Sequence, residues 1–157
     1  MEGKSDGAQK YQVGFEIVKS EYESALSRFK EMDNKFNMLL VFAAGEIAAF
    51  GAILQFFSGN LKIIFLWLFI PFLFISVLLN FVGLFKKKIA LINTERLHKR
   101  STYDIDIIEF YGSSIRSYNE SINSIEKVIK LKCVLFNVSL VFSLLSLIIF
   151  CIFVIIL

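Results

Sequence analysis

Two long apolar runs separated by only three residues constrain this chain more than any other feature. The runs cover residues 38–57 and 61–85, and Ser58-Gly59-Asn60 joins them. Each run is long enough to cross a hydrocarbon core of roughly 30 Å, which takes ~20 apolar residues in a helix. Lipid offers a backbone no hydrogen-bond partners, so each run must satisfy its own amides and carbonyls as a helix. A connection this short predicts an antiparallel helical hairpin in a membrane.

A third apolar run, residues 133–157, contains no charged side chain. The chain of 157 residues is 56% hydrophobic and only 20% charged, with a mean hydropathy of +0.66. A soluble domain has about a quarter of its residues charged. The charge is also segregated, because residues 1–37 and 86–132 hold all of it except Glu46 and Lys62. The expected fold is an all-α membrane protein with three transmembrane helices per chain and two charged helical extensions.

The basic residues predict the orientation. With three spans, both charged extensions lie on one side of the membrane. Of the 17 Lys and Arg residues, six lie in residues 1–37 and ten in 86–132, and an excess of basic residues marks the cytoplasmic side. We expect a multi-pass protein with a cytoplasmic N-terminal helix over 1–37 and a transmembrane hairpin over 38–85. A basic cytoplasmic helical insert over 86–132 and a third transmembrane helix over 133–157 follow, with the C-terminus outside.

The N-terminal extension carries a heptad pattern. After a disordered lead over residues 1–7, a helix is expected to begin near Ala8 and to run without a break into the first span. Its apolar positions recur at 3-4 spacing and form one stripe: Phe15, Val18, Tyr22, Ala25, Phe29, Met32 and Phe36. Such a stripe packs on another helix. That helix is either the second cytoplasmic helix of the same subunit or, as in a coiled coil, a helix of a neighbouring subunit.

Glu46 lies well inside the first apolar run. A carboxylate at that depth costs a few kcal/mol, so its side chain is expected to face protein or water and not lipid. One interpretation is a ring of Glu46 side chains that lines, gates or attracts ions to the pore of an oligomer. The other is a protonated carboxyl that hydrogen-bonds a neighbouring helix, at Asn80 or Asn137. The same run has small residues at i, i+4 and i+8, a face that lets another helix approach closely: Ala44, Ala48 and Ala52.

A second seam leads into the third span. A capping box at Ser101-Thr102-Tyr103-Asp104 opens a helix, and Gly112-Ser113-Ser114 is expected to break it. The seam then continues at 3-4 spacing: Ile115, Tyr118, Ile122, Ile125, Ile129, Lys132, Phe136, Ser139, Ser143, Ser146 and Phe150. Inside the membrane its serines either pack and hydrogen-bond between helices or line a narrow aqueous path around a central axis. The predicted pore or gate residues are Glu46, Phe136, Ser139, Ser143 and Ser146.

The basic insert is the candidate ligand site. The three lysines directly after the hairpin, Lys86, Lys87 and Lys88, hold the helix end at anionic headgroups in one interpretation. In the other, they join the remaining basic residues in binding phosphate groups, Arg through paired hydrogen bonds and Lys as a point charge. The predicted ligand-binding residues are Lys86, Lys87, Lys88, Arg96, Lys99, Arg100 and Arg116.

Catalytic motifs are missing from the sequence. One His and two Cys residues are too few for a Cys/His metal cluster, and both Cys lie in the last apolar run. We find no Gly-rich phosphate loop, nucleophile triad or paired catalytic carboxylates. The chain is therefore expected not to be an enzyme, with no catalytic residue, metal ligand or cofactor.

Three short stretches carry a family resemblance. They are Met32-Asp33-Asn34-Lys35-Phe36-Asn37 at the entry to the first span, Ile107-Ile108-Glu109-Phe110-Tyr111-Gly112-Ser113-Ser114-Ile115 in the insert, and Lys130-Leu131-Lys132 at the entry to the third span. With this layout the chain resembles the small transmembrane effectors of bacterial anti-phage nucleotide-signalling systems. The Pycsar-type membrane effectors are the nearest, the CBASS-associated small membrane effectors are cousins, and the Hailong-type channel effector is similar in size and plan.

The resemblance implies a dormant protein of the bacterial inner membrane. Its cytoplasmic part would sense a nucleotide or oligonucleotide made by a partner nucleotidyltransferase or cyclase. On activation it would permeabilise the membrane and cause abortive infection. Three spans of one chain cannot enclose a water path, so a channel requires a homo-oligomer. Closed cyclic symmetry is the default for such an assembly, and a tetramer is the subunit number that we favour. The alternatives are a non-conducting membrane anchor or assembly subunit that recruits a soluble cytoplasmic partner, and a constitutive holin-like toxin.

Overall fold

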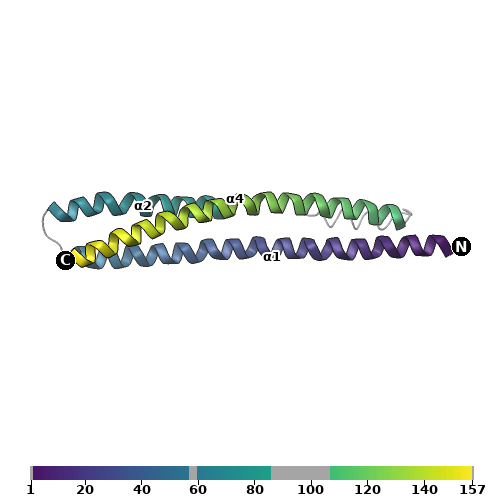
Figure 1. The fold of residues 1–157 in the computed structure, drawn as a ribbon, viewed down its shortest axis with the longest axis horizontal. Helices are drawn as coiled ribbons and strands as arrows, with labels where there is room; N and C mark the ends of the chain where they lie inside the picture. The colour runs from purple at the N-terminus through teal and green to yellow at the C-terminus, as the bar shows by residue number, and fades with distance from the viewer. Residues whose placement is uncertain (1, 57–59, 86–106, 157) are drawn as a thin grey trace. The chain divides into compact units, whose positions relative to one another are not determined.

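The structure is a computed structural model that describes residues 2–56, 60–85 and 107–156. All of the described residues are helical (Figure 1). Helix α1 covers Glu2–Ile53 and is followed by a 3-10 turn, η1, at Leu54–Phe56. Helix α2 covers Asn60–Phe85, and helix α4 covers Ile107–Ile156. The described part of the chain is therefore all-α, as predicted.

Each of the three long helices contains a segment apolar enough to cross a membrane. The segments lie in Gln9–Ile53, Ile63–Phe85 and Ile108–Ile155, with window hydropathies of 1.8, 2.5 and 3.0. Large apolar side chains also point outward from them, among them Trp67 (77% exposed) and Ile155 (83% exposed). Outward apolar side chains suit contact with lipid tails, which are as apolar as leucine. The three predicted spans are confirmed as helices of sufficient length and hydropathy, which indicates a multi-pass membrane protein.

Helix α1 begins earlier than the sequence pattern predicted. It starts at Glu2, so the expected start near Ala8 is wrong, and it runs for 52 residues without a break into the first apolar run. Isolated glycines cost a helix only about 1 kcal/mol each relative to alanine. Gly3 and Gly7 therefore do not end a helix that continues for so many residues beyond them.

Helix α4 is also longer than predicted, because it passes through Gly112-Ser113-Ser114 without a break. Two serine hydroxyls explain the continuity. Ser113 Oγ donates to the carbonyl of Phe110 at 3.0 Å, and Ser117 Oγ donates to the carbonyl of Ser113 at 3.0 Å. These bonds to the preceding turn are the ones that let serine stay inside a helix. The capping box predicted at residues 101–104 lies outside the described residues.

The chain divides into two compact units. The extension unit combines Met1–Lys30 with Lys88–Ile129, and the span unit combines Glu31–Lys87 with Lys130–Leu157. Helices α1 and α4 each contribute one part to each unit. The candidate site lies in the span unit.

In the extension unit, the heptad stripe of α1 packs on α4 of the same chain. Its buried core consists of Ala25, Phe29 and Ile125, with Tyr22, Leu26, Val128 and Ile129 against it. An aromatic ladder continues this contact, since the ring of Tyr118 lies 5.5 Å from that of Phe15 and 5.3 Å from that of Tyr22. Of the two partners considered for the stripe, the structure contains the one within the subunit. Contact with a neighbouring subunit remains a prediction.

In the span unit, α1 and α4 run in the same direction and α2 runs against both. Rings pair between α1 and α4 in parallel register, Phe36 with Phe136 and Phe50 with Phe150. Toward α2 the order reverses, because Phe65 pairs with Phe153 while Phe72 pairs with Phe142. A cluster of buried side chains closes one end of the unit: Ala43, Phe50, Phe65, Phe69, Leu73 and Phe153. We call this the phenylalanine cluster.

Gly83 allows α2 to approach α1 closely. A Cβ atom at Gly83 would overlap the ring of Phe36, which is fully buried and packs edge-on against Phe136 at 5.6 Å. Gly83→Ala is therefore expected to lower the free energy of unfolding by about 1 kcal/mol, the lower end of the cost of overpacking a core. The matched control is Gly45→Ala, where a Cβ atom meets nothing within 4 Å. Thermal unfolding of the detergent-solubilised protein, followed by circular dichroism, compares the two. Equal melting temperatures for both variants would contradict the close approach at Gly83.

Candidate functional site

A row of polar side chains lies buried inside the span unit, where all three helices are otherwise apolar. The row, which we call the polar track, consists of Glu46 from α1, Ser76 and Asn80 from α2, and Ser139, Ser143 and Ser146 from α4. Glu46 is 6% exposed and Ser143 is 1% exposed, while the other four side chains are fully buried. The three serines of α4 share one face because they recur at 3-4 spacing. That face points toward α1 and α2 of the same chain.

Ser76 and Ser139 join α2 to α4. Ser139 Oγ lies 2.9 Å from the backbone carbonyl of Ser76, and Ser76 Oγ lies 3.1 Å from the carbonyl of Ser139. The two hydroxyl oxygens are 3.1 Å apart. Each hydroxyl thus has an acceptor on the facing helix. This is the packing and hydrogen-bonding role considered for the serine seam, whereas the lining of a central path by the same serines remains a prediction.

Glu46 bonds to α4 through Ser146. Ser146 Oγ lies 2.8 Å from Glu46 Oε2 and also 2.8 Å from the backbone carbonyl of Ser143. A hydrogen bond to a neighbouring helix was one of the two interpretations of Glu46, but the suggested partners Asn80 and Asn137 are wrong. Asn80 makes no such bond, and Asn137 is exposed. The second carboxyl oxygen, Oε1, is buried and has no hydrogen-bond partner among the described residues.

Two more members of the track have unpaired polar atoms. Within the described part of the chain, Asn80 Nδ2, Asn80 Oδ1 and Ser143 Oγ are buried without a hydrogen-bond partner. An unsatisfied buried donor or acceptor costs about 1–3 kcal/mol. Such groups are few in native proteins, and each one calls for an explanation such as bound water, an ion or a functional role. Here three side chains with unpaired atoms belong to a single track.

Aromatic rings close the track at both ends. On α1 and α4, Phe36 and Phe136 precede the polar residues and pack edge to face, with ring centroids 5.6 Å apart and an interplanar angle of 89°. At the opposite end lies the phenylalanine cluster, in which Phe50 and Phe69 stack at 4.1 Å. The predicted gate residue Phe136 thus lies at one end of the track. The rings separate the polar groups from whatever lies beyond each end.

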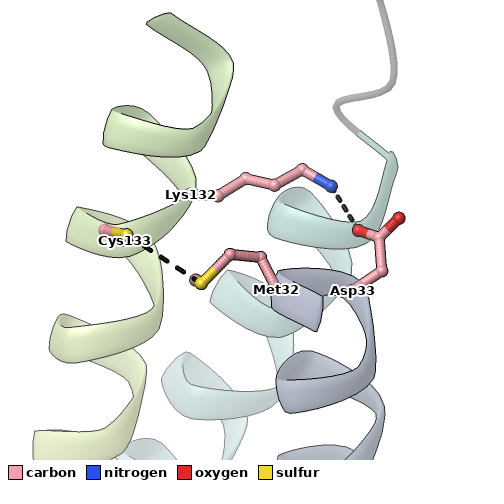
Figure 2. A network of polar contacts seen from close by, with 4 residues as sticks. All are labelled: Met32, Asp33, Lys132 and Cys133. Carbon is pink, nitrogen blue, oxygen red and sulfur yellow. Dashed lines mark hydrogen bonds and ion pairs between the residues drawn. The ribbon is translucent and has the colours of Figure 1, made fainter. Parts of the chain in front are cut away.

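A buried ion pair joins Asp33 and Lys132, three and four residues before Phe36 and Phe136 in the sequence. Figure 2 shows this pair. The ammonium of Lys132 on α4 forms an ion pair and hydrogen bond with Asp33 Oδ1 on α1. The Lys132 side chain is fully buried, and that of Asp33 is 20% exposed. Figure 2 also shows the neighbouring contact, in which Cys133 Sγ lies 3.9 Å from Met32 Sδ.

Asp33 and Lys132 lie in separate stretches of the family resemblance, and the sequence pattern did not predict that they form a pair. A signal was present, because Lys132 occupies a seam whose neighbouring positions are apolar or serine. A lysine almost never enters such a face without an acidic partner. The two candidates near its level on α1 were Glu31 and Asp33. Glu31 instead pairs with Lys35 at 2.8 Å on the exposed side of α1, and this hydrogen bond from Lys35 lowers the pKa of the Glu31 carboxyl.

Of the predicted phosphate-binding residues, the structure describes only Arg116. Its guanidinium is exposed and pairs with Glu120 at 3.4 Å along α4. The other six lie outside the described residues: Lys86, Lys87, Lys88, Arg96, Lys99 and Arg100. A shallow depression on the extension unit is lined by Ser20, Glu21, Ser24, Arg28, Ile122 and Glu126. Because it has two carboxylates and one guanidinium, it does not favour a phosphate.

No group of three or more His, Cys, Asp or Glu side chains that could hold a metal ion occurs within the ranges described. Both cysteines, Cys133 and Cys151, are free thiols. Comparison of the chain with protein-family models, with curated proteins and with solved structures finds no match.

Proposed function

We propose that this protein is an anti-phage membrane effector of the bacterial inner membrane. In this proposal, copies of the chain assemble into a homo-oligomeric ion channel, with a tetramer favoured. The signal is a nucleotide or oligonucleotide made by a partner nucleotidyltransferase or cyclase, and the response is loss of the membrane barrier and abortive infection. The residue patterns around Asp33 and Tyr111 support the family assignment, and the polar track supports the channel.

The observation that carries the channel proposal is the polar track. Ionisable groups inside membrane spans are rare, and they mark ion and substrate pathways when they occur. Glu46 lies inside the first apolar run with one carboxyl oxygen unpaired among the described residues, and Ser143 lies near it with an unpaired hydroxyl. Packing alone gives no reason to keep these groups, because an apolar side chain of similar size would avoid the cost of burying them.

In this proposal the described conformation is the closed state. The serines of α4 are turned toward α1 and α2 of their own chain, so a path along a central axis requires α4 to turn and expose them. The hydrogen bonds between Ser76 and Ser139 oppose that rotation, but neutral bonds of this kind are worth only about 1 kcal/mol each. The ligand controls the channel by binding the open and closed conformations with different affinity.

A non-conducting anchor is the second candidate, and a specific observation favours it. Ser139 has acceptors within its own chain, and Ser146 bonds to Glu46 within its own chain. An anchor needs only such internal contacts to hold its three helices together. It would recruit a soluble cytoplasmic partner through its extension unit.

Ion flux through liposomes that contain the purified protein tests these candidates. The panel is no ligand, cyclic nucleotides, and short DNA and RNA oligomers, with K⁺ and Cl⁻ flux as the readout. The channel proposal predicts flux that one ligand class switches on or off. It also predicts that neutralising Lys86, Lys87 and Lys88 alters the ligand response. The matched control is Cys151→Ala, an exposed position on α4, which is expected to behave as wild type. No K⁺ or Cl⁻ flux from a folded oligomer under any condition would favour the anchor.

A further inference from the structure

We infer that copies of this chain meet through the outward face of α1, the face opposite the one that is buried within the chain. The inference rests on the homo-oligomer of the proposed function and names the surface that joins its subunits. This face differs from the heptad stripe, which in the extension unit is buried against α4 of the same chain. A channel and a non-conducting anchor would both use it.

In the extension unit, the outward face of α1 carries no charged residue. Its members, which we call the outward row, recur at 3-4 spacing and are all exposed: Val13, Ile17, Ser20, Ser24 and Ser27. Val13 is 51% exposed and Ile17 is 54% exposed. Of the other ten exposed residues between 9 and 30, seven are charged. The charge of this part of α1 therefore lies beside the outward row and not on it.

The outward face of α4 in the same unit has the opposite character. Its exposed residues at 3-4 spacing are Arg116, Glu120, Asn123 and Lys127, and three of the four are charged. A helix that packs through one apolar stripe ordinarily carries charged and polar residues on the face away from it. This is what α4 does. The uncharged row of α1 departs from that pattern, which indicates a second contact.

In the span unit, the outward residues of α1 differ from those of its neighbours in size. The outward row continues at 3-4 spacing through exposed residues: Asn34, Met38, Val41, Gly45, Ala48 and Ala52. The exposed residues of α2 and α4 are larger, as Phe74 and Ile148 illustrate. A Cβ atom added at Gly45 or Gly51 would meet nothing within 4 Å, so packing inside the chain does not require small residues here. Small residues on a spanning helix let a second helix approach closely.

The partner that fits the whole row is α1 of a second copy. Copies of one chain share one orientation in the membrane, so their α1 helices run parallel around a symmetry axis and the same residues meet at the same level. Uncharged residues then face uncharged residues, and small residues face small ones. A soluble protein would cover only the first part of the row and lipid only the second, whereas α1 continues through both as one helix.

Glu31 is the one charged residue within the spacing of the row, between Ser27 and Asn34. Its carboxylate is paired with the ammonium of Lys35 on the same helix at 2.8 Å. The pair offsets the repulsion between Glu31 side chains of adjacent copies. The row therefore keeps its match with a second copy at this level.

The row is long enough for a stable contact. It extends from Val13 to Ala52 along α1, which at 1.5 Å per residue is ~60 Å, and a helix with its side chains is ~10 Å wide. A contact along its full length covers roughly 600 Å² on each copy, or about 1,200 Å² in total. Specific protein interfaces begin at about this area.

Cysteine crosslinking of the full chain in liposomes tests the contact. The background variant carries Cys133→Ser and Cys151→Ser, which remove both free thiols. Ser24→Cys and Ala48→Cys place one thiol in the outward row of each unit. The matched controls Asn123→Cys and Val141→Cys place one on the outward face of α4, where both positions are exposed. A disulfide forms only where Cβ atoms come within about 4.5 Å of each other. After oxidation with copper phenanthroline, covalent dimers are expected from both α1 positions and from neither α4 position.

Native mass spectrometry of the wild-type protein in mild detergent separates the surface from the assembly. An oligomer whose α1 positions do not crosslink, or which crosslinks only through α4, would overturn the contact and leave the homo-oligomer standing. A monomer would overturn the homo-oligomer of the proposed function and the contact with it. An oligomer with crosslinks at Ser24→Cys and Ala48→Cys alone supports both.

A bulky residue in the row gives a second readout without oxidation. Ala48→Leu is expected to raise the protein concentration at which the oligomer dissociates by about tenfold, which corresponds to the lower end of the cost of overpacking a contact. Cys151→Leu, a similar increase in size at an exposed position of α4, is the matched control and is expected to leave that concentration unchanged. Equal dissociation of the two variants would contradict a close approach at Ala48.

Discussion

Replacing Asp33 by alanine is expected to lower the free energy of unfolding by about 3 kcal/mol, the lower end of the cost of breaking a buried ion pair. The reason is the asymmetry of the pair, in which the Lys132 side chain is fully buried and that of Asp33 is 20% exposed. Asp33→Ala leaves a buried ammonium without the carboxylate that faces it. In thermal unfolding of the detergent-solubilised protein, this loss corresponds to a melting temperature lower by roughly 6–12 °C for a chain of this size.

The double variant Asp33→Leu with Lys132→Met tests whether the stability lost in Asp33→Ala comes from leaving Lys132 without its partner charge. Replacing both members of a buried ion pair by apolar groups of similar volume is often neutral or stabilising, so this variant is expected to regain most of the lost stability. Glu31→Ala, which breaks the exposed pair with Lys35 on the same helix, is the control and is expected to change little. If Asp33→Ala and Glu31→Ala melt at the same temperature, the Asp33–Lys132 contact does not stabilise the span unit.

Phe69→Ala is expected to lower the free energy of unfolding by about 2 kcal/mol. Phe69 is 1% exposed and stacks on Phe50 with ring centroids 4.1 Å apart. In a membrane most of the transfer contribution vanishes, because lipid tails are as apolar as the side chain. The cavity cost remains, at ~24 cal/mol per Å³ over roughly 100 Å³ of lost ring volume.

Phe74→Ala on the same helix is the matched control, since Phe74 is 59% exposed. The substitution is chemically identical but leaves no internal cavity, so its melting temperature is expected to stay near that of wild type. A Phe74→Ala variant as unstable as Phe69→Ala would mean that Phe74 packs against protein, for example at an interface between copies of the chain. Thermal unfolding in the same detergent measures both variants.

Much of the architecture follows from the sequence alone, because lipid leaves a chain few choices. Residues 38–57, 61–85 and 133–157 are long and apolar enough to require helices, and the structure has three such helices. The absence of proline and glycine between Phe15 and the first span favoured a helix that continues into that span without a break, which the structure confirms. Residues that commonly end helices were a less reliable guide to where the helices stop. Gly112-Ser113-Ser114 does not end α4, because the hydroxyls of Ser113 and Ser117 bond back to the preceding turn.

The partners within the candidate site needed the tertiary structure. Spacing of 3-4 residues showed that Ser139, Ser143 and Ser146 share one face, but not whether that face meets another subunit or the hairpin of its own chain. The contacts that decide this join residues 63 apart in the chain for Ser76 with Ser139, 99 for Lys132 with Asp33, and 100 for Ser146 with Glu46. Periodicity is a property of one helix, whereas a contact depends on the axial and rotational register of two. Side-chain packing sets that register, so the sequence determined three spanning helices and only the folded chain paired Glu46 with Ser146.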